Sequence, residues 1–303
     1  MAVLMPTPLL ICVKALNGGV FVALFAVLGE MMQPKRFAGI FGASPAVALA
    51  NLIVIALAQG DASARGAATG MIAGAVALAA ACAAAIPAVR RWGAIRGSAL
   101  LWGVWILVGV AAAVPLTTAT TGTGSARFAA GFPAGGRARR GDKGGRSTGP
   151  GGGRLFTVDF AALREIPPDA LALRFAFGAG VSIVAGLIGV AAGKRAGGAM
   201  LAAPAVLSAT LTIIEKREGR GAAVTEVQGS GPGAVALIGF AVVAATSTAR
   251  LPLAVALLCA LATWVAAAIG GYLAQATILP SWRRDAGDLA RRRRDAARIR
   301  RRH

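Results

Sequence analysis

Two basic residues lie inside apolar stretches of this sequence, where a charge is costly. Lys14 lies in LLICVKALNGGVFVALF, and Arg174 lies in LALRFAFGAGVSIVAGLIG. A charged side chain at mid-helix costs roughly 2.5 to 3.5 kcal/mol on membrane-insertion scales, so each residue is a candidate ligand for an anion. Each also lies near the start of its stretch, from where a long side chain reaches the headgroup region. Both interpretations stay open: two snorkelling cations, or a pair that binds one anion.

Uncharged polar residues accompany these cations. Asn17 lies close to Lys14, and Asn51 and Thr210 lie in two further apolar stretches. Such side chains add hydrogen bonds to a shared polar cavity, although bonding between neighbouring helices is their commoner use in membranes. The candidate substrate-binding residues are therefore Lys14, Arg174, Asn17, Asn51 and Thr210.

Catalysis and metal binding have little support in the sequence. The single histidine, His303, is the last residue, and three cysteines lie in apolar stretches without the spacing of metal ligands: Cys12, Cys82 and Cys259. No nucleophile with a positioned base, and no pair of carboxylates, is found in the apolar stretches. We expect no enzyme, no cofactor and no metal site.

The composition is that of a membrane protein. Of 303 residues, 56% are hydrophobic and only 15% are charged, with a mean hydropathy of +0.69. The net charge of +20 comes from residues between apolar stretches and in two long basic segments, not from an amphipathic surface. Nucleic acid is therefore not an expected partner. The expected partners are the lipid bilayer and its anionic headgroups, and a homo-oligomer is left open.

The elements that must position these residues are membrane-spanning helices. About 20 apolar residues are needed to cross the hydrocarbon core of a bilayer. We expect an all-α membrane protein with about eight transmembrane helices. They are predicted at 9–29, 38–58, 66–88, 97–115, 170–192, 196–214, 231–249 and 251–275.

These helices divide the chain into two transmembrane units. Residues 1–116 and 169–278 each hold four predicted helices. Between them, 117–168 is rich in Gly and Arg and is predicted to be a disordered cytoplasmic linker; 279–303 is a basic tail. Because cytoplasmic loops carry the excess of Lys and Arg, these two segments place both termini in the cytoplasm of a bacterial inner membrane. The exceptions, on the other side, are Arg90, Arg91 and Arg96.

One phrase occurs in both units. Residues 34–47 read PKRFAGIFGASPAV, and residues 193–206 read GKRAGGAMLAAPAV. This similarity predicts a duplicated four-helix unit. Because four spans per unit is an even number, we expect parallel repeats related by an axis along the membrane normal.

The repeated phrase predicts close packing and a kink. Its small residues let another backbone approach, as does the ridge of glycines at spacing four in the third helix: Gly66, Gly70 and Gly74. Pro45 and Pro204 each remove a helical amide and free a carbonyl, so both helices are predicted to kink within the membrane. Such a discontinuity either lines a binding site or merely shapes the bundle.

Two stretches carry a resemblance. PKRFAGIFGASPAVALANL and GGAMLAAPAVLSATLTIIEKREG resemble the signature stretches of a family of uncharacterised bacterial inner-membrane proteins with a four-helix unit. More distantly, the unit is similar to the GlpM-like proteins and to the small-multidrug-resistance branch of the drug/metabolite transporter group. Pumps of that branch rely on a glutamate in the first helix, where this chain has Lys14, and Arg174 in the second unit. Cation-for-proton exchange is therefore not expected.

Two hypotheses for function follow. In the first, the protein binds or transports a small anionic solute between the two units, with Lys14 and Arg174 as ligands of its charge. In the second, it is a membrane scaffold that transports nothing and uses its basic segments to dock lipid or protein. A polar cavity around the cations favours the first, and a dry seam with both cations at the headgroups favours the second.

Overall fold

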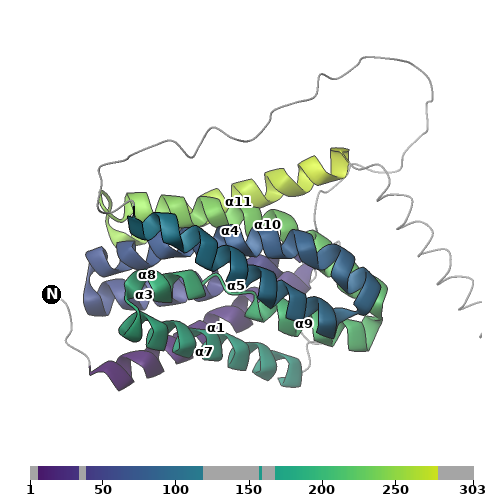
Figure 1. The fold of residues 1–303 in the computed structure, drawn as a ribbon, viewed down its shortest axis with the longest axis horizontal. Helices are drawn as coiled ribbons and strands as arrows, with labels where there is room; N and C mark the ends of the chain where they lie inside the picture. Colours follow the sequence, from purple (N-terminus) through teal and green to yellow (C-terminus); the bar gives the residue numbers. More distant parts are fainter. Residues whose placement is uncertain (1–5, 34–38, 119–156, 159–167, 279–303) are drawn as a thin grey trace, which may run out of the picture.

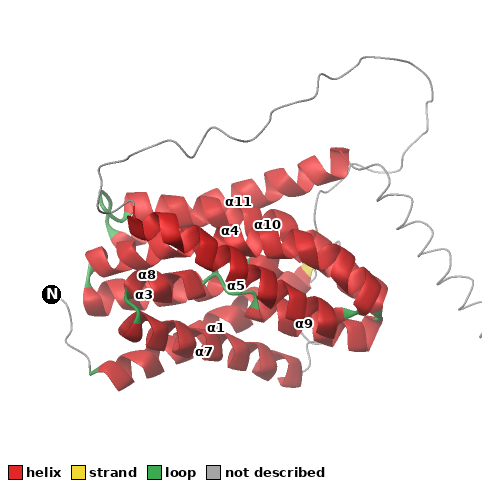
Figure 2. Cartoon of the chain, in the orientation of Figure 1, coloured by secondary structure: helices red, strands yellow, loops and turns green. Residues whose placement is uncertain are grey.

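The protein is a bundle of long helices (Figure 1). The computed structural model describes residues 6–33, 39–118, 157–158 and 168–278. Figure 2 shows that helix accounts for nearly all of it. The helices are α1 (Thr7–Met31), α3 (Ala46–Gln59), α4 (Asp61–Trp92), α5 (Ala94–Thr118), α7 (Pro168–Ala191), α8 (Lys194–Met200), α9 (Ala205–Glu218), α10 (Arg220–Ser247) and α11 (Leu253–Ile278), with the short 3-10 helix η1 (Gly39–Ala43).

The outside of the bundle is as apolar as its inside. Among the described residues, eight helical segments are long and apolar enough to cross a membrane. Large apolar side chains cover the surface, among them Leu16, Leu57, Ile95, Leu107, Val190 and Leu258. A soluble protein rarely exposes apolar surface of this extent, whereas lipid accommodates it. The structure is therefore that of a multi-pass helical membrane protein.

Two helices begin earlier than the apolar pattern indicates. The sequence predicts starts at 66 and 231, but α4 begins at Asp61 and α10 at Arg220. Each follows a glycine with positive φ, Gly60 at 84° and Gly219 at 88°. Glycine adopts this backbone without steric cost, so α3 turns directly into α4, and α9 into α10. The polar first turns belong to the helices although they are not apolar.

The two prolines of the repeated phrase begin helices instead of kinking them. Pro45 is the N-cap of α3, and Pro204 is the N-cap of α9. Proline suits a helix start because its missing amide has no partner there. Each span is thus broken into two pieces, η1 with α3 and α8 with α9. The predicted mid-helix kink is replaced by a break.

Helices α1 and α7 cross in antiparallel directions. Gly18 faces Ser182, Gly178 faces Val22, and farther along α1 Glu30 contacts Arg174. Because residue numbers rise on one helix as they fall on the other, the two units do not run parallel. This contradicts the predicted axis along the membrane normal. The even number of spans per unit implies parallel units only if the linker begins and ends on one side.

The antiparallel crossing also separates the two ends of the described chain. We call the end of the bundle where α1 begins the Thr7 end, and the opposite one the Met31 end. Helix α1 begins at the Thr7 end, whereas α11 finishes at the opposite end of the bundle (Figure 1). Thr7 and Ile278 therefore lie on opposite sides of any bilayer that the bundle spans. The prediction that both termini are cytoplasmic does not agree with this arrangement.

A small strand pair lies where α1 ends. Strand β1 (Met32–Gln33) pairs antiparallel with β2 (Thr157–Val158). Strand β2 belongs to the segment predicted to be a disordered linker, so that prediction is wrong for residues 157 and 158. Most of the linker, the basic tail, and Lys35 and Arg36 of the repeated phrase lie outside the described residues.

The two copies of the repeated phrase pack across the molecule. Helix α8 lies on the glycine ridge of α4, where a Cβ on Gly70 would lie 1.9 Å from the Arg195 carbonyl oxygen. In the same way, η1 lies on α10, where a Cβ on Gly233 would lie 2.6 Å from the Ile40 oxygen. Each copy therefore packs against a long helix of the other unit, as glycine spacing predicts for a close approach of backbones.

Further contacts are matched between the units at a shift of 159 residues. The Trp105 indole donates to the Gly74 carbonyl oxygen at 3.0 Å, and Trp264 donates to the Gly233 oxygen at 3.2 Å. Gly60 and Gly219, and likewise Pro45 and Pro204, are separated by the same shift. In both units, therefore, the second span is broken at the same position, and the fourth span packs on the third through the same tryptophan–glycine contact.

Candidate functional site

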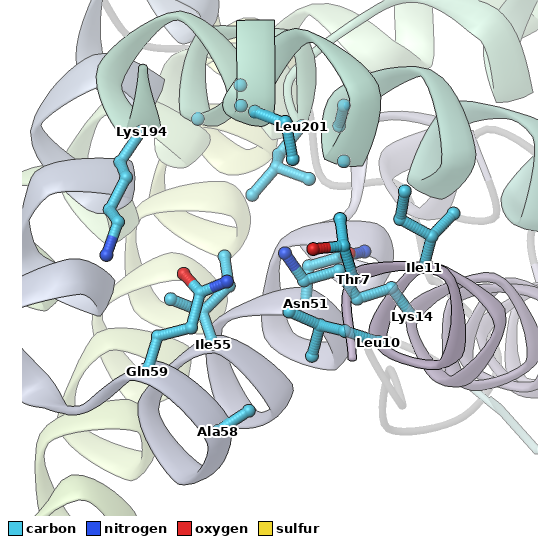
Figure 3. Close-up of a pocket in the computed structure, with 16 residues that line it drawn as sticks. Thr7, Leu10, Ile11, Lys14, Asn51, Ile55, Ala58, Gln59, Lys194 and Leu201 are labelled. Carbon is cyan, nitrogen blue, oxygen red and sulfur yellow. The ribbon is translucent and has the colours of Figure 1, made fainter. Parts of the chain in front are cut away.

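A cavity of about 380 Å³ lies at the Thr7 end, between α1, α3, α7 and α8. Lys14 and Asn51 line it together, and Lys194 and Leu201 lie across from them (Figure 3). Gly189 also lines it. The glycines of α8 let this helix approach α7 and α4 closely, since a Cβ on Gly197 would lie 2.6 Å from the Ala185 oxygen and one on Gly198 2.0 Å from the Ala67 oxygen. The volume of the cavity is in the range of small-molecule sites.

Both charged residues of the cavity lining are cations. The Lys14 side chain is buried, with 7% of the residue exposed, whereas Lys194 is exposed and donates to the Ser63 hydroxyl. Among the residues that the structure describes, no Asp or Glu lines the cavity. Within the described part of the chain, Lys14 has no hydrogen bond or ion pair. Lys14 Nζ is not among the fully buried polar atoms. A cation in such a confined cavity lacks a counter-ion, and an anion in the cavity would supply one.

Polar side chains continue from the cavity into the centre of the bundle. Asn51, 1% exposed, donates through Nδ2 to the Ser182 hydroxyl and to the Val47 carbonyl oxygen, both at 2.9 Å. Ser182 in turn donates to the Gly178 oxygen at 2.9 Å. Asn51 Oδ1 is buried and has no hydrogen-bond partner among the described residues. The cavity thus ends on an amide that retains an unused acceptor.

Only two of the five predicted ligands lie together. Lys14 and Asn51 line the cavity. Asn17 instead binds α3, donating to the Ala50 oxygen at 2.8 Å, and Thr210 donates within its own helix to the Val206 oxygen at 2.9 Å. Asn17 thus makes the bond between neighbouring helices that the sequence left as the alternative use, whereas Thr210 makes a bond within one helix, which was not among the predicted uses.

Arg174 is separated from Lys14. It forms an ion pair with Glu30 at the Met31 end, with Nη2 2.7 Å from Oε1. Lys14 approaches Gly186 on the antiparallel α7, and the 12 residues from there to Arg174 correspond to about 18 Å along the helix. The two cations therefore do not form one site, and the predicted pairing of Lys14 with Arg174 is wrong.

Sequence reasoning missed Lys194 and Ser182 as parts of the site. Lys194 stands in the repeated phrase, but the apolar pattern places it in a loop on the side opposite to Lys14. Only the antiparallel direction of α7 brings the start of α8 to the Thr7 end. The one signal in the sequence was the glycine content around it, Gly189, Gly197 and Gly198, which now line the cavity.

Comparison of the chain with protein-family models, with curated proteins and with solved structures finds no significant match. The fold and the cavity alone define the class of protein. It is a multi-pass, all-helical membrane protein with a cavity at one end, and both charged residues of the cavity lining are lysines.

Proposed function

We propose that the protein is a permease for a small anion, which binds in the cavity at the Thr7 end. The observation that carries the proposal is Lys14, a residue only 7% exposed whose side chain lines the cavity without a hydrogen bond or ion pair in the described chain. Lys194 at the mouth attracts the anion, and Lys14 binds it farther in. A dianion such as sulfate or hydrogen phosphate neutralises both side chains.

The arrangement of the two units supports transport over simple binding. We infer that they are inverted repeats, related by an axis in the membrane plane, because α1 and α7 cross antiparallel and the matched contacts recur at a constant shift. In transporters built this way, the binding site becomes accessible from each side in turn as one repeat moves against the other. The broken spans at Pro45 and Pro204 supply the discontinuities at which such folds bind their ligands.

We propose that the Met31 end faces the cytoplasm of a bacterial inner membrane. The Lys and Arg residues at this end, Arg90, Arg91, Arg96, Lys216, Arg217 and Arg220, outnumber those at the Thr7 end, Arg65, Lys194, Arg195 and Arg250. Helix α11 also finishes at this end, at Ile278. This orientation accounts for Arg90, Arg91 and Arg96 by the positive-inside rule, whereas the orientation predicted from the sequence leaves them as exceptions. The cavity then opens away from the cytoplasm.

The scaffold hypothesis expects an interface between the two units that contains no polar cavity, with both cations at the lipid headgroups. Lys14 lines a cavity that also holds the polar residues Asn51 and Gln59 in a mostly apolar lining. Arg174 is held in an ion pair, with 9% of its side chain exposed. These two observations favour binding of a solute over docking by the basic segments.

Thermal unfolding of the purified protein in a neutral detergent tests the proposal. A ligand that binds only the folded state stabilises it by about 2.7 kcal/mol at a hundred times its Kd. We expect sulfate, phosphate or a small carboxylate to raise the Tm of the wild type but not of Lys14→Gln. Arg174→Gln is the matched control and keeps the response. No response of the wild type to any anion, or an equal response of Lys14→Gln, overturns the proposal.

A further inference from the structure

The Met31 end contains the counterpart of the cavity. At a shift of 159 residues, the cavity residues Asn51 and Gly189 correspond to Thr210 and Glu30. The counterpart of Arg174 is Ala15, so Lys14 lies one position before it. Both cations are 7% exposed. Lys14 lies near the start of α1 and Arg174 near the start of α7, the two helices that cross. The same architecture therefore places a buried cation at each end of the bundle.

The two ends differ in what stands beside the cation. Gly189 lines the cavity, and its counterpart Glu30 places a carboxylate oxygen 2.7 Å from Arg174 Nη2. A second cavity glycine, Gly186, corresponds to Val27. At the Thr7 end Gly186 and Gly189 carry no side chain, and a Cβ on Gly186 would lie 4.0 Å from Lys14 Cδ. At the Met31 end the counterpart of Gly189 is a glutamate, which pairs with the cation.

The pair that Glu30 makes resembles a ligand contact more than a surface ion pair. Only 9% of the Arg174 side chain is exposed, whereas 46% of Glu30 is exposed. The guanidinium is thus fixed within the bundle, and the carboxylate reaches it from the solvent side. The neighbouring pair, Arg217 with Asp169, is different, because its atoms are 3.5 Å apart and its side chains are 48% and 76% exposed.

We propose that Arg174 forms a second anion site, in which the Glu30 carboxylate takes the place of the ligand. This inference rests on the proposed function of the cavity. The guanidinium presents a rigid fork of donors that fits the two oxygens of a carboxylate or the face of an oxyanion. An anion of the class that binds Lys14 binds Arg174 once Glu30 is displaced, and Glu30 otherwise keeps this end closed. The two sites lie on opposite sides of the bundle, as entry and exit require.

Equilibrium binding of radiolabelled sulfate to the purified, full-length protein in a neutral detergent tests the second site. Sulfate stays a dianion over the whole working pH range, so changes in binding report on the protein. We expect Glu30→Ala to double the binding capacity per chain relative to the wild type. Adding Arg174→Gln to Glu30→Ala returns the capacity to that of the wild type, and adding Lys14→Gln to Glu30→Ala does the same by removing the other site.

Asp169→Ala is the matched control, because it removes a carboxylate from the same end without touching Arg174; its capacity stays that of the wild type. Glu30→Gln serves as a second variant that keeps the side-chain volume, and it also raises the capacity. If the wild type binds sulfate through Lys14 but neither Glu30 variant binds more, the second site is refuted and the proposed function stands. If the wild type and Lys14→Gln bind equally, the proposed function itself fails. An increase with Asp169→Ala equal to that with Glu30→Ala would show a general charge effect and also overturn the inference.

Discussion

The Thr7 end and the Met31 end of the bundle are built from the same elements but end in different chemistry. At both ends α1 and α7 meet a broken span, and at both ends a basic side chain is buried at the crossing. At the Thr7 end that cation faces a cavity, and at the Met31 end it is paired with Glu30. The same backbone features occur in both units, whereas the side chains beside the two cations differ.

This difference shows which features the fold constrains. Gly60 and Gly219 both adopt positive φ, and Pro45 and Pro204 both cap a helix, because the turn and the break have the same geometry in each unit. Position 30 and its counterpart at 189 lie near the end of a helix, where either a glutamate or a glycine fits. This difference, together with that between Gly186 and Val27, distinguishes the cavity beside Lys14 from the ion pair of Arg174.

The largest expected effect is in a labelling experiment that tests whether the two units cross the membrane in opposite directions, because each position is labelled from one side or the other. Asp61 and Arg220 are counterparts, each at the first position of a long helix and exposed. In a chain whose native cysteines are replaced, Asp61→Cys and Arg220→Cys should react with a membrane-impermeant maleimide from opposite sides of the membrane. Labelling of both from the same side would mean that the units are parallel, and the comparison of the two ends would lose its basis.

The second prediction compares the two copies of the repeated phrase. Gly39 and Gly198 are counterparts, but a Cβ on Gly198 would lie 2.0 Å from the Ala67 oxygen, and one on Gly39 would lie 3.0 Å from the Glu226 oxygen. Both contacts are with backbone, which does not yield easily. We expect Gly198→Ala to destabilise the protein by about 3 kcal/mol and Gly39→Ala by about 1 kcal/mol, measured by thermal unfolding in detergent.

Gly66→Ala is the control for these two variants. A Cβ there would meet nothing nearer than the Lys194 Cβ at 3.7 Å, although Gly66 lies on the same ridge of α4 as Gly70. It should leave the Tm within a degree or so of the wild type, because ordinary van der Waals contact needs no rearrangement. An equal loss in all three variants would indicate that helix flexibility, not close packing, accounts for these glycines.

The third prediction concerns a variant that has a glutamate at the Thr7 end, at the position that corresponds to Glu30. Gly189→Glu introduces at the Thr7 end the carboxylate that stands beside Arg174 at the Met31 end. The substitution introduces no clash at the Cβ, which would meet only the Gly197 Cα, at 3.8 Å. We expect it to pair with Lys14 and to weaken sulfate binding about tenfold or more, which corresponds to about 1.4 kcal/mol. Gly189→Gln, of the same size but uncharged, should weaken binding less; equal losses would assign the effect to steric blocking.

The sequence predicted the spans but not their arrangement. Apolar runs of sufficient length located each crossing, and the repeated phrase located the two breaks, because both signals are local. The direction of α7 depends on the linker, whose composition carries no information about which side it ends on. Because the direction of α7 could not be predicted, the sequence did not indicate that Glu30 pairs with Arg174, which is 144 positions away. Lys14 and Asn51 could be proposed as ligands because an intramembrane polar residue is costly wherever it lies.

The smallest expected effect tests how closely the two units agree. Trp105 and Trp264 are both buried, and each donates its indole N–H to a glycine carbonyl oxygen of the preceding long helix. Replacement by Phe keeps most of the aromatic packing but leaves a buried acceptor without this donor, so each variant should lose about 1 kcal/mol in thermal unfolding. The two losses should agree within about 0.5 kcal/mol and should add in the double variant, as expected for distant sites. A loss confined to one tryptophan would mean that the two bonds, although matched in geometry, do not stabilise their units alike, and that divergence between the ends extends into the core.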